Sequence, residues 1–197
     1  MQQFILKLAM AAGSLTACNS SSNDTAIETN KDSAKVSAPV ATADTTVVEA
    51  STAFPAKEII AGYLQVKNAF TKDDSKGAAT AGNALATLLT NATTTSLVAE
   101  KQKTFADLQD DMKEHAEHIG TNPGKIAHQR EHFIMLSSDM ADFIKTFGNA
   151  GQILYKDHCP MANDGKGANW ISEVKEIHNP YLGAKMPSCG TVKATIQ

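Results

Sequence analysis

Apolar residues recur at helical intervals in four stretches between Phe54 and Gly148. In the first stretch the intervals are four, three and four residues, which places the side chains on one face of an α-helix. The four predicted stripes are Ile59, Tyr63, Val66 and Phe70; Ala78, Ala81, Leu85, Leu88 and Ala92; Phe105, Leu108, Met112 and Ile119; and Phe133, Leu136, Met140, Phe143 and Phe147. Because the connections are short, the pattern predicts an up-down four-helix bundle over residues 54–148. The many Ala and Gly residues of the second helix predict a close approach to a neighbouring helix.

The helical pattern stops at Gly148. Residues 148–197 contain six of the 12 glycines and three of the 6 prolines, residue types that interrupt regular structure. We therefore expect residues 149–197 to form an irregular tail packed on the bundle, with at most short strands at residues 153–155 and 191–192. The predicted fold class is all-α.

The amino-terminal residues have the pattern of a secretory signal peptide. A weakly positive start precedes an apolar run and then small residues, and LTAC at residues 15–18 resembles a bacterial lipobox. We expect residues 1–17 to be a lipoprotein signal peptide and Cys18 to be lipidated, which attaches the protein to a membrane. Asn19, in place of Asp, indicates the outer membrane of a bacterial envelope, facing the periplasm. A plain signal peptide is the alternative.

The segment after Cys18 is expected to be a disordered tether. Of the 35 residues from 19 to 53, 19 are Ser, Thr or Ala, and none is aromatic. Such a composition buries too little apolar surface to offset the entropy lost on ordering. The domain organisation is therefore a signal peptide (1–17), a lipidated cysteine with its tether (18–53), a bundle (54–148) and a tail (149–197).

Composition and charge exclude two classes of protein. The net charge is −3 and no cluster of Lys and Arg is present, whereas nucleic-acid binders usually carry a basic face. No apolar stretch reaches the roughly 18–20 residues of a membrane-spanning helix. We expect no nucleic-acid partner and no transmembrane helix.

The tail concentrates residues that bind soft metal ions. His158, Cys159 and Met161 lie together, and Met186 and Cys189 follow about thirty residues later. Thiolate and thioether sulfurs select Cu(I) and similar ions, and Pro160 and Pro187 stiffen the two segments. We expect a Cu(I) or Ag(I) site in which Cys159, Met161, Met186 and Cys189 are ligands, with His158 as a further ligand.

A disulfide is the competing interpretation of the same cysteines. With Cys18 lipidated, two cysteines remain in an oxidising compartment. A Cys159–Cys189 bridge would hold the tail in place without a metal, and Met161 and Met186 would then fill the core. The residues alone leave the bridge and the metal site equally open.

A second group of histidines lies on the third and fourth predicted helices. His115 and His118 are three residues apart and His128 and His132 are four apart, so each pair shares a helix face. A turn near Asn122 puts His115 opposite His128, which predicts a metal site formed by His115, His128 and His132. Glu114 and Glu117 would orient the rings. The alternative is a solvated, polar end of the hairpin.

Catalysis is not expected. Residues 128–132 match the HxxEH pattern of inverted zinc peptidases. A peptidase also needs a further ligand on another helix and a large substrate cleft, and few residues remain outside the four helices to build one. We expect a binding protein, not an enzyme.

The sequence also resembles a bacterial family that is labelled a domain of unknown function. The resemblance rests on YLQVKNAFTKDDSKGAA (63–79), YKDHCPMA, NWISEVKEIHNPYLG and MPSCG, and it covers residues 54 to about 193. It differs from the family pattern at Ile171, Leu182 and Pro187. The motif positions carried over are Cys159, Met161, Trp170, Asn179, Pro180, Tyr181, Gly183, Met186, Cys189 and Gly190.

Several expectations follow from that resemblance. Similar domains are attached to periplasmic adaptor proteins of copper and silver efflux systems, which implies metal handling and an efflux adaptor or pump as the partner. From their size, Trp170 and Tyr181 are expected to anchor the tail to the bundle, and residues 179–183 to form a turn. The expected function is copper binding and transfer by an envelope lipoprotein. The alternative is a structural or interaction lipoprotein with a Cys159–Cys189 disulfide and no metal.

Overall fold

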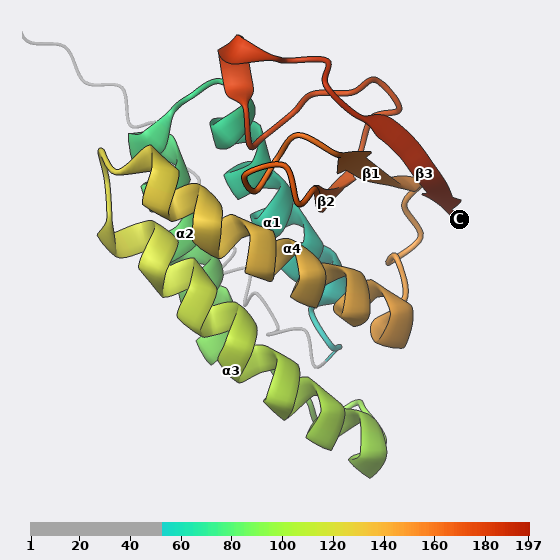
Figure 1. The fold of residues 1–197 in the computed structure, drawn as a ribbon. Coiled ribbons are helices and arrows are strands. Elements are labelled where there is room, and N and C mark those ends of the chain that lie inside the picture. Colours follow the sequence, from blue (N-terminus) through green and yellow to red (C-terminus); the bar gives the residue numbers. More distant parts are fainter. Residues whose placement is uncertain (1–52) are drawn as a thin grey trace, which may run out of the picture. The chain divides into compact units, whose positions relative to one another are not determined.

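A computed structural model of the chain describes residues 53–197. The predicted signal peptide, Cys18 and the tether up to residue 52 lie outside the described residues. Four helices come first: α1 (Ala56–Thr71), α2 (Ser75–Thr90), α3 (Ala99–Thr121) and α4 (Ile126–Phe147). Each packs against the next in chain order, and α1 also contacts α4 (Figure 1). The predicted four-helix arrangement is confirmed.

Local sequence explains where these helices begin and end. The carboxylate of Asp74 precedes α2 and accepts a hydrogen bond of 2.8 Å from the amide of Gly77, which satisfies a donor that the first turn leaves free. Gly148 follows α4 with a φ of 87°, a conformation that glycine adopts without strain. Pro55 stands directly before α1, where its missing N–H costs nothing.

Aromatic side chains fill both ends of the bundle core. Phe54 lies 4.9 Å from both Phe105 and Phe147, measured between ring centroids. Nearer the sheet, Tyr63 stacks on Phe133 with the centroids 5.3 Å apart. Aromatic side chains of this size contribute much of the energy of a small core. The predicted apolar stripes therefore face the interior.

The tail forms a small antiparallel sheet. Its strands are β1 (Leu154–Cys159), β2 (Ala168–Ser172) and β3 (Thr191–Ile196), in the order β2-β1-β3, with a short 3₁₀ helix at Gly183–Lys185 between β2 and β3. The strands are longer than the sequence predicted, and β2 was not predicted at all. Adjacent residues Trp170 and Ile171 are both buried, so β2 is covered on both faces and lacks the alternation that marks a half-exposed strand.

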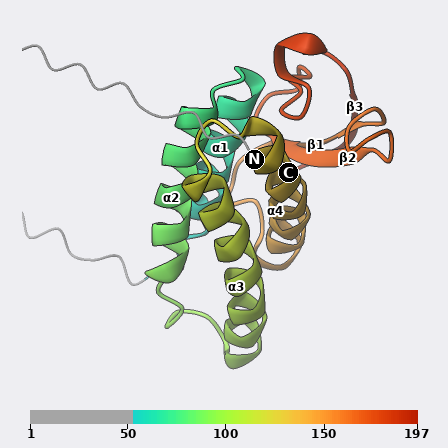
Figure 2. The same ribbon diagram turned by 60° about the vertical axis from the view of Figure 1, so that its left-hand side comes forward.

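The sheet packs against the bundle through β2, which contacts α4 and α1, as Figures 1 and 2 show. A polar link joins the two layers: the hydroxyl of Tyr63 lies 2.8 Å from that of Ser137 and accepts a hydrogen bond from the amide of Ile171. β3 forms the outer edge of the sheet and contacts only β1 among the described elements. Over residues 53–197, none of the helices combines the length and apolar character needed to cross a membrane.

Candidate metal centre

Four histidines gather at the end of the hairpin formed by α3 and α4. His115 and His118 come from the last turns of α3, and His128 and His132 come from the first turns of α4. The rings of His118 and His132 stack in parallel with their centroids 4.1 Å apart. His128 stands nearly perpendicular to His132, with a centroid separation of 4.8 Å. The cluster therefore draws on two helices joined by only four residues.

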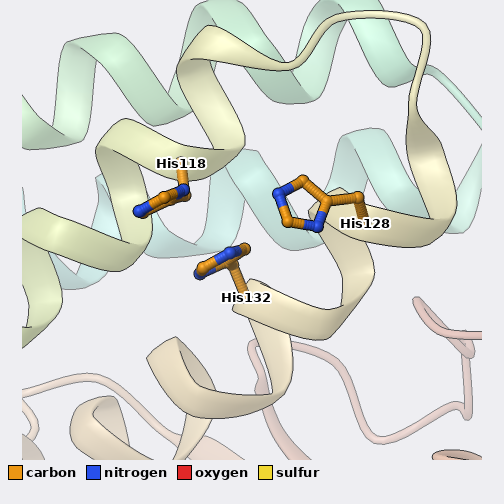
Figure 3. A group of neighbouring side chains, drawn as sticks. All are labelled: His118, His128 and His132. Carbon is orange, nitrogen blue, oxygen red and sulfur yellow. The ribbon is translucent and has the colours of Figure 1, made fainter.

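Three of these histidines form a group that can hold a metal ion. One ring nitrogen each from His118, His128 and His132 lies within 4.8 Å of the others. Figure 3 shows the three side chains lying together between the helices. Three nitrogens bound to one ion at about 2.1 Å would lie about 3.4 Å apart. Because the rings of His118 and His132 stack in parallel, binding one ion requires these rings to turn toward it as well as to move closer.

Carboxylates stand beside two of the three imidazoles. Nδ1 of His128 lies 3.2 Å from Glu131, which leaves Nε2 free to bind an ion. Nε2 of His118 lies 4.0 Å from Glu114, which leaves Nδ1. Histidines that bind metals commonly donate their second ring N–H to such a partner, because this fixes the tautomer and the ring orientation. Glu117, the other carboxylate expected in this role, pairs with Lys113 instead.

The fourth histidine, His115, lies behind the triad. Its Nδ1 is 3.4 Å from Nδ1 of His132, and its Nε2 is 3.7 Å from the carboxylate of Asp139. Burial lowers the pKa of His115 and of His132, and the neighbouring imidazoles add to the effect. Both rings are therefore held neutral near pH 7, the form that binds metal ions.

Asp139 is the most perturbed acid of the cluster. Burial raises its pKa to about 6, and the negative charges of Asp111 and Asp142 add to the shift. Its Oδ2 atom is buried and has no hydrogen-bond partner. This oxygen can therefore accept a hydrogen bond from a nearby N–H group.

The structure groups these residues differently from the sequence prediction. His115 was predicted to join His128 and His132, but the triad contains His118 in its place. The hairpin turns about one to two residues later than assumed, so His118 lies against His132 and His128, and His115 lies against His132 alone among the two histidines of α4. The spacing of the two pairs was sufficient to find all four histidines, and only the position of the turn decided which three converge.

The two cysteines of the tail also come together. Their sulfur atoms lie 2.7 Å apart, and no disulfide bond joins them in the structure. Cys159 ends β1 and is buried, whereas Cys189 precedes β3 and is partly exposed. The contact with Cys159 raises the pKa of the Cys189 thiol. Residues that are thirty positions apart in the sequence therefore form one sulfur pair.

The other predicted ligands surround this pair in different ways. The amide of Met161 donates to the Cys189 sulfur, and the amide of Cys189 donates to the carbonyl of Met186. Both methionine side chains are exposed, by 55% and 37%. His158 neighbours Cys159 on a strand and so points to the opposite face, where its ring contacts Asn169 at 3.1 Å. The structure therefore places the two cysteines and the backbones of Met161 and Met186 together. The His158 ring lies on the opposite face of the strand.

The motif of residues 179–183 supports the sulfur pair. The Asn179 side chain accepts hydrogen bonds from the amides of Tyr181 and Leu182 and donates one of 2.7 Å to the carbonyl of Cys189. Pro180 contributes its carbonyl to Arg130 on α4. Trp170 is buried edge-on against Tyr181. Gly183 has a φ of 52°, and a Cβ there would collide with Asp73, so the tight turn requires glycine.

Comparison with known protein families gives a match over part of the chain. Residues 59–152, which span α1 to α4, match the family described as "Protein of unknown function (DUF3347)". No curated protein and no solved structure matches the chain. The family match includes the histidine cluster and ends before the sulfur-bearing tail.

Proposed function

We propose that this protein is an envelope lipoprotein that binds copper and passes it to an efflux system. The observation that carries the proposal is the convergence of ring nitrogens from His118, His128 and His132 within 4.8 Å. Neighbouring imidazoles disfavour one another's protonated form, and the neutral form is the one that binds a metal ion. The resemblance to domains attached to copper and silver efflux adaptors supports copper as the ion and such an adaptor or pump as the partner.

The donor set indicates which ions the triad accepts. Neutral imidazoles suit Cu(II), Zn(II) and Ni(II), and they lack the sulfur that favours monovalent ions. Three protein ligands leave a coordination position open. Because the three side chains are only half-buried, a group from a donor or acceptor protein has access to that position. An open, partly exposed site fits a protein that transfers its ion.

The sulfur pair supports a second, softer site in the same protein. Cys159 and Cys189 supply thiolates, and Met161 and Met186 supply exposed thioethers on adjoining turns. Two thiolates on one ion with metal–sulfur bonds of about 2.3 Å lie about 3.7 Å apart, so the 2.7 Å pair must open by about 1 Å to bind Cu(I) or Ag(I). We propose that the reduced tail binds the monovalent ion.

Metal titration tests the histidine site. Cu(II) or Zn(II) is added to the purified full chain with Cys18→Ser, in competition with a chelator of known affinity. The variant with His118→Ala and His132→Ala is expected to lose at least 100-fold in affinity. His178→Ala is the matched control, because His178 is exposed and lies in the tail near Glu176. If the double variant binds the ion as tightly as the wild type, the histidine triad is not the metal site.

Cu(I) titration tests the sulfur site separately. The variant with Met161→Leu and Met186→Leu keeps the side-chain volumes, and it is expected to bind Cu(I) more weakly in the presence of a reductant. The same variant should bind Cu(II) at the triad as tightly as the wild type. Unchanged Cu(I) affinity would remove the thioethers from the proposal.

The alternative is a structural lipoprotein whose tail is closed by a disulfide. One observation favours it: the sulfur atoms at 2.7 Å are nearer to the bonded distance of about 2.05 Å than to the separation required across a metal ion. Thiol counting on protein purified from the envelope without reductant distinguishes the two. No free thiol, together with no metal binding at the triad, would establish the structural role.

Attachment to the membrane is the remaining part of the proposal. Cys18→Ser in the full chain is expected to abolish incorporation of a labelled fatty acid and to release the protein from the membrane fraction. If Cys18→Ser protein is still labelled, Cys18 is not the site of lipidation.

A further inference from the structure

We infer that Asp139 positions the metal ligand His132 by acting through His115. The inference rests on the proposed metal site and assigns the residues that orient its third ligand. The contacts form a chain that starts at the triad and runs along the seam between α3 and α4: His132, then His115, then Asp139.

The triad members differ in the partners that stand behind them. His128 and His118 each have a glutamate on their own helix, at 3.2 Å and 4.0 Å. His132 has no carboxylate within 4.0 Å among the described residues, and its Nδ1 faces a second imidazole at 3.4 Å. A ring without a fixed hydrogen-bond partner is free to adopt either tautomer. His115 is therefore the group that sets the tautomer of His132.

His115 in turn needs a partner of its own to do this. To accept a hydrogen bond from Nδ1–H of His132, Nδ1 of His115 must be unprotonated. The single N–H of the neutral His115 ring must then be on Nε2. That nitrogen faces Oδ2 of Asp139 at 3.7 Å, and this oxygen is buried without any hydrogen-bond partner. A buried acceptor without a donor is costly, and a small rotation of His115 supplies the donor.

The completed chain presents one nitrogen of His132 to the ion. Asp139 accepts from Nε2 of His115, and Nδ1 of His115 accepts from Nδ1 of His132. The Nε2 atom of His132 is then left unprotonated and free to bind. Carboxylate–imidazole pairs of this kind increase the basicity of a metal-binding histidine, and their loss typically lowers metal affinity about 10- to 100-fold.

The test replaces Asp139 by leucine, which has nearly the same shape and suits a largely buried position. Nitrogen-15 NMR of the metal-free protein at pH 8 reports the tautomer of His132. We expect the Nδ1–H form in the wild type and a mixture of tautomers in Asp139→Leu. Zn(II) affinity should fall at least 10-fold in the same variant. The matched control is Asp142→Leu, which removes the same charge from an exposed position of α4 and should change neither result.

The two readouts separate this inference from the proposed function. If the wild type binds no Zn(II) or Cu(II), the metal site fails, and the tautomer of His132 still tests the chain of contacts. If Asp139→Leu leaves the tautomer unchanged, the positioning role is overturned whatever the affinity. A third variant, His115→Phe, retains an aromatic ring without a proton acceptor and is expected to reproduce both effects of Asp139→Leu.

Discussion

The ammonium group of Lys67 on α1 lies 2.7 Å from the carboxylate of Glu173, which directly follows β2. Lys67 is only 1% exposed, so this ion pair is the main partner of a buried cation. Glu173 also accepts a hydrogen bond from Asn68. One residue of the tail thus neutralises a charge that the bundle cannot hydrate, and the sheet is fixed to α1 at this point.

Removing the carboxylate is expected to destabilise the protein. Glu173→Ala removes the ion-pair partner of the buried Lys67 and leaves the carboxylate of Asp157, which is not in contact with it, as the nearby negative charge. The free energy of unfolding should fall by about 1–3 kcal/mol, discounted because Glu173 is partly exposed. Urea denaturation at pH 7 measures the change. In a Lys67→Met background the same substitution should cost less than about 0.5 kcal/mol. An equal loss in both backgrounds would show that the pair contributes nothing.

The same pair predicts a loss of stability in acid. Burial raises the pKa of Glu173, but the hydrogen bonds from Lys67 and Asn68 outweigh it, so the pKa lies below its ordinary value of 4.5. A lowered pKa adds stability that is present above pH 4.5 and is lost as the pH falls through the folded-state pKa. The difference in unfolding free energy between wild type and Glu173→Gln should therefore shrink below pH 4.5.

Asp157 predicts the opposite dependence on pH. It is fully buried on the central strand β1, and neither carboxylate oxygen has a hydrogen-bond partner. Burial raises its pKa from 3.8 to about 6, against the attraction of Lys67. The folded state binds this proton more tightly than the unfolded state, so stability is greatest below about pH 4 and falls as the pH rises through 6.

Asp157→Asn should therefore stabilise the protein at neutral pH. The amide has the same shape and no charge, and we expect a gain of about 1–3 kcal/mol at pH 7.5 that disappears near pH 4. Thermal unfolding at both pH values measures it. Asp142→Asn, at an exposed position, is the control and should change little. If Asp157→Asn is less stable than the wild type at pH 7.5, ionisation of the buried Asp157 carboxylate does not destabilise the folded protein.

Gly82 on α2 marks a close contact between the backbones of α2 and α3. A Cβ atom at this position would lie 2.8 Å from the carbonyl oxygen of Ala116 on α3, and a backbone atom cannot move aside cheaply. Gly82→Ala should cost about 1–3 kcal/mol in unfolding free energy despite the better helix propensity of alanine. Gly62→Ala is the control, because the Cβ there meets only the flexible side chain of Leu85 at 3.0 Å. Similar costs at both glycines would contradict the packing argument.

The helices could be predicted from the sequence, because one apolar stripe is enough to identify each of them. Tyr63 and Phe133 lie on predicted stripes and stack in the core. The sheet was largely missed for a physical reason. β2 is covered by helices on one face and by the segment around Ile177 and Gly190 on the other, and β3 is mostly exposed on both faces. β2 therefore lacks the alternation from which strands are recognised, whereas β3 does alternate polar and apolar residues from Thr191 to Ile196, of which only the first two were predicted as a strand.

The histidine cluster could be found from the sequence, but its grouping could not. Helical spacing places two histidines on one face of each helix, and the short connection makes the faces meet. Which rings converge depends on a shift of one to two residues in the turn at Asn122–Lys125. The role of Asp139, more than twenty residues from His115 in the sequence, depends on the same register. Spacing alone carries no signal for such a pair.

The sulfur pair predicts that the edge strand β3 responds to oxidation. β3 contacts only β1 among the described elements, and Cys189 lies two residues before β3 begins. A Cys159–Cys189 bridge would join the end of β1 to the start of β3 and close a loop of about thirty residues, worth roughly 3–4 kcal/mol through the unfolded chain. Backbone amides of β3 should then exchange with deuterium more slowly in oxidised than in reduced protein.

Hydrogen exchange followed by mass spectrometry measures this directly, with peptides from β3 compared with peptides from α4. We expect oxidation to slow exchange at residues 191–196 at least 10-fold. Amides of α4 that exchange by local opening should change little, because local opening of the helix does not depend on the bridge. The Cys189→Ser variant should exchange at the reduced rate under both conditions. If oxidised wild type and Cys189→Ser exchange equally fast in β3, the strand is held by its ladder with β1 alone and the bridge does not stabilise it.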